Sequence, residues 1–126
     1  MAKLARALPD AAAYAMANLR PAETGLPMVV WVVAAHGHAR QDVWVKVCRM
    51  RGPVPHGFGN TVSVAVRPQP HLEPPGQAMG ALTAADLQAV YDWCALNRAA
   101  LIDYWESAIN TPELHHRLRR FGELVG

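Results

Sequence analysis

The sequence predicts an α+β fold: a three-stranded antiparallel meander covered by one long helix, with short N- and C-terminal helices. Two segments, 42–49 and 61–67, alternate valine with polar or small residues, as strands with one buried face do. A third segment, 28–35, is apolar and mostly β-branched, which is typical of a strand covered on both faces. Apolar residues at three- and four-residue spacing between 83 and 109 predict the long helix.

The elements before the helix follow from composition and turn chemistry. Residues 1–20 are rich in alanine and predict an N-terminal helical arm, with Asp10 as the cap of a short helix over 11–19. The β-meander spans 28–67. Its first two strands should pair antiparallel, because the connection between them is too short for a crossover.

Proline and glycine are frequent in residues 68–81, which therefore predict a long loop. A capping-box sequence opens the helical part, 83–122. Asn97 and Arg98 interrupt the apolar stripe of the long helix, so either the helix kinks there or these polar groups meet a specific partner. The Thr-Pro pair at 111 predicts the start of a last short helix.

Composition limits the class of protein. The chain has 126 residues, 52% of them apolar, and a formal net charge of +2, which fits a single domain over 1–126 and excludes a disordered chain. The longest apolar run, 26–35, is about half a membrane span, so we expect no membrane association. Cys48 and Cys94 form no disulfide framework and suit a reducing compartment, which predicts a cytoplasmic location.

Basic residues are concentrated in two regions, whereas the long helix is acidic. The first region, 40–67, contains Arg40, Lys46, Arg49, Arg51 and Arg67, and the last helix contains His115, His116, Arg117, Arg119 and Arg120. One interpretation is a solvated surface whose halves attract each other weakly. The other is a nucleic-acid interface, with Arg40, Lys46, Arg117, Arg119 and Arg120 as the candidate contacts.

His36 and His38 are the sharpest candidates for site chemistry. At i, i+2 in an extended chain they point to the same side and can chelate one metal ion. No further ligand stands at a fixed offset, so we expect surface histidines, no metal and no other cofactor. Cys48 lies beside basic residues that would lower its pKa, yet no catalytic signature surrounds it. A metal- or thiol-dependent enzyme therefore ranks third, and we expect no catalytic residue.

Two tryptophans indicate a protein-binding surface. Trp31 and Trp44 lie on neighbouring strands, and a three-stranded sheet under one helix leaves its other face uncovered. An apolar patch of that kind exceeds what monomers usually expose. The predicted binding residues are Trp31, Trp44, Lys46, Arg49 and Arg67. The expected partner is another protein chain, either a second copy or a heterologous protein.

A wider pattern combines a histidine-bearing hairpin, a strand, a glycine-leucine lead and a helix with a W…N…L…W rhythm. Its residues are His36 and His38 ahead of Asp42-Val43-Trp44-Val45, then Gly80-Ala81-Leu82, Trp93, Asn97, Leu101 and Trp105. Over roughly residues 28–110 this pattern resembles a group of small bacterial domains of unknown function, some with toxin–antitoxin-like or mobile-element roles. The chain departs from it in the proline loop at 68–80 and in the terminal helices.

This resemblance carries over no catalytic residue. It implies an accessory protein of mobile elements, such as an inhibitor of host defence or an antitoxin. The sequence as a whole therefore predicts a small non-catalytic protein-binding module. The alternative is a nucleic-acid-binding protein that uses the basic sheet face and the C-terminal helix.

Overall fold

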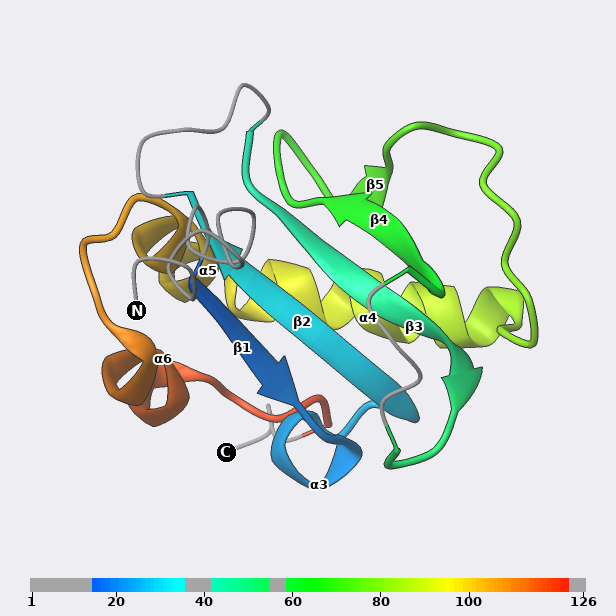
Figure 1. Cartoon of the computed structure of the whole chain (residues 1–126), viewed down its shortest axis with the longest axis horizontal. Coiled ribbons are helices and arrows are strands. Elements are labelled where there is room, and N and C mark those ends of the chain that lie inside the picture. The colour runs from blue at the N-terminus through cyan, green and yellow to red at the C-terminus, as the bar shows by residue number, and fades with distance from the viewer. Residues whose placement is uncertain (1–14, 36–41, 55–58, 123–126) are drawn as a thin grey trace, which may run out of the picture.

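A computed structural model describes residues 15–35, 42–54 and 59–122. Over these residues the chain forms a five-stranded antiparallel sheet and four helices (Figure 1). The strands, which lie side by side in chain order, are β1 (Ala15–Leu19), β2 (Met28–Ala34), β3 (Trp44–Arg51), β4 (Thr61–Ala65) and β5 (His71–Leu72). The helices are α3 (Pro21–Thr24), α4 (Ala84–Leu96), α5 (Arg98–Trp105) and α6 (Thr111–Arg117).

The three central strands follow the valine pattern. β2 pairs antiparallel with β3, and β3 with β4, so that Val45 stands between Val32 and Val64. The valines expected to face the core, Val43, Val45, Val47, Val62, Val64 and Val66, are at most 1% exposed. The antiparallel pairing and the buried faces of these strands are thus confirmed.

The prediction of a three-stranded meander is wrong, because one further strand lies at each edge of these three strands. β1 occupies residues whose alanine content predicts the short N-terminal helix, and the rest of that arm, 1–14, lies outside the described residues. All five residues of β1 pair with β2, and Ala17 and Leu19 are buried. Helix propensities differ by only tenths of a kcal/mol per residue, so this burial outweighs them. β5 lies within the segment predicted as a loop, 68–81, and its two residues are too few to show a period.

The single long helix over 83–109 is also wrong. α4 ends at Leu96 and α5 begins at Arg98. Between them, the buried Asn97 donates from its amide nitrogen to the carbonyl oxygen of Arg119 at 3.0 Å and accepts the Arg119 N–H at 2.7 Å. Both alternatives considered for Asn97 therefore hold: the helix is interrupted there, and the Asn97 side chain has a specific partner in Arg119.

Helices α4, α5 and α6 form a layer that, in the view of Figure 1, extends past β1. α4 and α5 run behind the strands, while α6 lies beyond β1, outside the outline of the sheet. The Tyr104 and Thr111 hydroxyls, 2.8 Å apart, join α5 to α6. Residues 118–122, the C-terminal strap, complete the layer, because the Phe121 N–H donates to the Thr24 carbonyl at 2.6 Å. Gly25 has φ +81°, and a Cβ there would lie 2.6 Å from the Phe121 carbonyl oxygen.

Candidate functional site

The two tryptophans of the predicted binding surface are buried. Trp31 and Trp44 are each 8% exposed, so the expectation of two exposed indoles is wrong. Trp31 lies between its Cα partners Asn18 of β1 and Lys46 of β3, because the sheet continues on both sides of β2. Trp44 meets the ring of Trp105 edge-on at 6.2 Å between centroids. The Lys46 ammonium lies 5.2 Å from the centre of the Trp44 ring, which is a cation–π contact.

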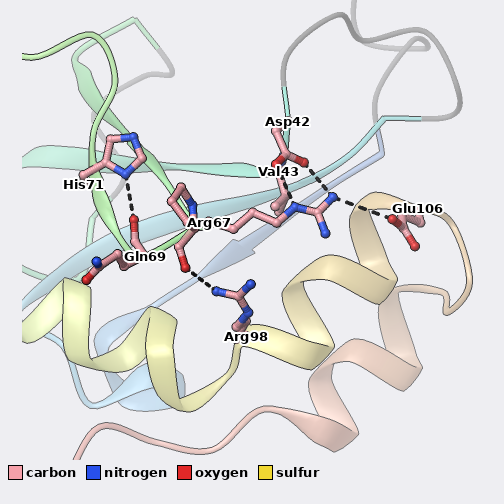
Figure 2. A network of polar contacts seen from close by, with 8 residues as sticks. Asp42, Val43, Arg67, Gln69, His71, Arg98 and Glu106 are labelled. Atoms are coloured by element: carbon pink, nitrogen blue, oxygen red, sulfur yellow. Dashed lines mark hydrogen bonds and ion pairs between the residues drawn. The ribbon is translucent and has the colours of Figure 1, made fainter.

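Arg67, another predicted binding residue, is held in an ion-pair network at one end of the sheet (Figure 2). Its guanidinium makes two hydrogen bonds of 2.7 Å to Asp42 and lies 3.7 Å from a Glu106 oxygen. The hydrogen bond from Arg67 holds the pKa of Asp42 below its usual value, and Asp42 in turn raises the pKa of Arg67. Arg98 donates to the Pro68 carbonyl at 2.6 Å. These contacts tie the strand ends to α5, which is a structural role.

A cavity of about 280 Å³ adjoins this network. Its lining includes Trp44, Ala65 and His71, which stand in one row across three strands, together with Asp42, Arg67 and Glu73. The Nδ1 atom of His71 is 2.6 Å from the Gln69 carbonyl oxygen, and its Nε2 atom is 3.5 Å from Glu73. The charged lining groups are thus engaged with one another, and their arrangement indicates no reaction.

The residues of the nucleic-acid hypothesis are not brought together. Lys46 lies on β3, where burial, and to a lesser extent Arg49, lowers its pKa. Arg117 lies at the end of α6 and donates to Asp103 at 2.7 Å, which neutralises its charge. Arg119 and Arg120 are exposed in the C-terminal strap, with the Arg119 backbone bound to Asn97. Arg40 lies outside the described residues.

The candidates for metal or thiol chemistry gain no support. His36 and His38 lie outside the described residues. Within the part of the chain that is described, no three His, Cys, Asp or Glu side chains are grouped to hold a metal ion. Cys48 is fully buried, so its thiol is out of reach of a substrate. No helix in the described ranges is long and apolar enough to cross a membrane.

One edge of the sheet is open. β1 pairs with β2 on one side, and no group of residues 15–35, 42–54 or 59–122 hydrogen-bonds to its other side. Edge strands are usually protected by charge, proline, a bulge or great shortness. The five residues of β1 carry no charge and no proline, and each pairs in register with β2. Met16 on this strand is 41% exposed, which is unusual for a large apolar side chain. Among the described residues, the outer side of β1 is therefore an unpaired and unprotected strand edge.

The opposite edge is closed. β5 contributes two residues, and beyond them the side-chain amide of Gln77 takes the place of a strand. Its oxygen accepts the Ser63 N–H at 2.9 Å, and its nitrogen donates to the Ser63 carbonyl at 2.9 Å. The same nitrogen lies 2.9 Å from the Pro74 carbonyl, which fixes the loop against β4.

A second cavity, of about 360 Å³, lies beside the end of β2 that pairs with the beginning of β1. It is lined by Ala34, the Cα partner of Ala15, by Tyr104 of α5, and by Ala108 and Ile109 of the segment that leads from α5 into α6. Glu113 of α6 adds a carboxylate. Neither this cavity nor the open edge is predicted from the sequence, because the alanine content of β1 predicts a helix there. The alternation of buried Ala17 and Leu19 with exposed Met16 and Asn18 was the available signal.

Comparison with family models, with curated proteins and with solved structures finds no match to this chain. The fold and the open edge are therefore the basis for a functional assignment.

Proposed function

We propose that this protein is a small non-catalytic protein-binding module that recognises its partner by strand addition at β1. The open edge carries this proposal: in the described part of the chain nothing pairs with the outer side of β1, and its five residues include no charge or proline that would discourage pairing. In strand addition, main-chain hydrogen bonds supply affinity and adjacent pockets supply specificity. The surface differs from the predicted one around Trp44, whose burial removes the apolar patch on which that prediction rested.

The pairing of charged side chains and the burial of both thiols favour a binding function over catalysis. The charged groups at the sheet end are paired, and both cysteines are buried. For the Cys94 thiol, burial raises the pKa to about 12, so it is protonated at neutral pH. Nucleic-acid binding is the weaker candidate, because Arg117 is paired with Asp103 and Lys46 lies on a different element.

The role of an accessory protein of mobile elements stays a prediction, which rests on the resemblance alone. The cytoplasmic location also stays a prediction. It rests on two cysteines that form no disulfide.

A blocked edge tests the proposal. Successive residues of an edge strand point their N–H groups alternately toward and away from the neighbouring strand, so one of Ala17→Pro and Asn18→Pro leaves the β1–β2 hydrogen bonds intact. The better-folded of the two proline variants and the wild type are each immobilised, and the proteins that they retain from an extract of the native host are compared. The control is Val54→Lys, at an exposed apolar position elsewhere. We expect a partner that wild type and the Val54 variant retain and the proline variant loses. Equal retention by all three would place the binding surface elsewhere.

A further inference from the structure

Among the described residues, the helix layer extends beyond the sheet at β1, and none of them occupies the position of one more strand there. α6 is attached to α5 through Tyr104 and Thr111, and the strap that follows it is bound to Asn97, so α6 belongs to the layer on one face of the sheet. In Figure 1, α6 nevertheless lies past β1, outside the outline of the sheet. A sixth strand added to β1 would therefore have a helix behind it, as the central strands do.

Resting on the proposed function, we infer that the partner is an extended peptide segment of another protein, with a large apolar anchor side chain and a basic residue near it. The second cavity, beside the end of β2 that pairs with the beginning of β1, receives the anchor. Its volume of about 360 Å³ lies within the ~300–1,000 Å³ typical of ligand pockets, and Ala34, Tyr104 and Ile109 give it apolar walls. Because Ala34 pairs with Ala15, the cavity lies where a strand paired with β1 reaches the end of the ladder.

Charge supplies the second part of the recognition. Glu113 is the charged side chain among the described residues that line this cavity. One of its carboxylate oxygens accepts the Asn110 N–H at 2.8 Å in the α6 capping box, which positions the carboxylate beside the cavity. A lysine or arginine beside the anchor complements it, whereas an acidic residue is repelled.

A second copy of this chain fits the edge less well. Antiparallel pairing of two β1 strands about a two-fold axis would place both overhanging α6 helices in one layer, where each would meet the helices of the other copy. A single extended segment adds no helix and avoids this conflict. β1 is also five residues long, so its pairing alone buries much less than the ~1,200 Å² of a stable dimer interface.

The experiment uses a displayed library of random linear peptides, selected on the wild-type protein and measured by fluorescence anisotropy. We expect the selected peptides to share an aromatic or large aliphatic residue with a lysine or arginine close by. Ile109→Asp should weaken their binding by about tenfold or more, as the loss of an anchor contact does. If that variant is unfolded, Ala108→Arg fills the cavity from an exposed position and should have the same effect. Glu113→Gln keeps the capping acceptor and should weaken binding several-fold.

Methylation of single backbone nitrogens in a selected peptide separates the two proposals. Strand addition predicts that methylation at alternate positions abolishes binding and that methylation between them does not. If methylation shows this alternation but the cavity variants bind as wild type does, the anchor proposal is wrong and the β1 edge remains the binding site. Loss of binding in the cavity variants without alternation would overturn the proposed edge function. Failure to select any peptide, or concentration-dependent dimers of the wild type in sedimentation, would overturn the assignment of the partner.

Discussion

The two edges of the sheet solve the problem of an unpaired strand in opposite ways. At the β5 edge, the chain places a two-residue strand and then the Gln77 amide against β4, so that the Ser63 backbone is paired by a side chain. At the β1 edge, five uncharged residues stand in regular register with β2 and nothing in the described ranges pairs with their outer side. Natural sheets usually protect both edges. The proposed function uses this difference, because among the described residues only the β1 edge leaves a row of backbone groups unpaired.

The largest expected effect is the unfolding of the whole sheet, which contains both edges. Val45 lies in the central strand β3 and is fully buried, so Val45→Asp places a charge in the core at a cost of several kcal/mol. We expect the variant to be unfolded by circular dichroism, whereas Val54→Asp, at a side chain that is 58% exposed, should melt as wild type does. A folded Val45→Asp protein would contradict the assignment of the buried face.

The closed edge should open when its amide is removed. Gln77→Ala leaves the Ser63 N–H and carbonyl without their side-chain partners, and the free energy of unfolding should fall by about 1–3 kcal/mol. Hydrogen exchange at the Ser63 amide should accelerate. Gln88→Ala is the matched control, since Gln88 is exposed on α4 and bonds only to Asp92 among its described contacts. An unchanged exchange rate at Ser63 would mean that β4 is protected in another way.

The open edge should show a smaller and asymmetric response to proline. Of Ala17→Pro and Asn18→Pro, the one whose N–H points outward should change stability little, while the other loses a bond to β2 and should cost about 1 kcal/mol or more. Thermal melts of the two variants give the comparison. Equal and large losses in both would show that β1 is paired on its two sides.

The smallest effect concerns the ion pair at the end of the sheet that lies beside β5. Because Arg67 depresses the pKa of Asp42 in the folded state, the pair stabilises the fold above the unfolded pKa of about 3.9, and this contribution is lost as pH falls through the folded value. The carboxylate is half exposed, so the loss should be at most about 1 kcal/mol. Melting temperatures of wild type and Asp42→Asn should converge as the solution is acidified. A constant difference across pH would contradict this assignment.

The sequence predicts the parts of the fold in which burial repeats along the chain. Valine at every second position defines β3 and β4, and an unbroken apolar run defines β2, because a sheet face imposes that period. At Asn97, a polar residue within an apolar stripe correctly marks either a break or a partner. The reach of its amide to Arg119, 22 residues away, depends on the tertiary fold and leaves no local signal.

The sheet edges and the candidate site were beyond the sequence pattern for physical reasons. Alanine at 15 and 17 favours a helix locally, and only the pairing with β2 reverses that preference. Gln77 closes an edge through its side chain, so it has no strand pattern. Trp44 alternates with valine and was expected to be exposed. Lys46 shares its strand face, as alternation predicts, but Trp105 of α5 covers Trp44 from a distant position that no spacing rule connects.

The C-terminal strap imposes an order on the folding of this protein during its synthesis. Asn97 and Thr24 emerge from the exit tunnel before Arg119 and Phe121, the residues whose backbones bind them. Until the later residues appear, water takes the place of Arg119 at the Asn97 side-chain oxygen and of Phe121 at the Thr24 carbonyl, so the joint between α4 and α5 stays hydrated. The nascent sheet can therefore pair its strands first, and the C-terminal strap, which is translated after Thr24 and Asn97, then closes the helix layer.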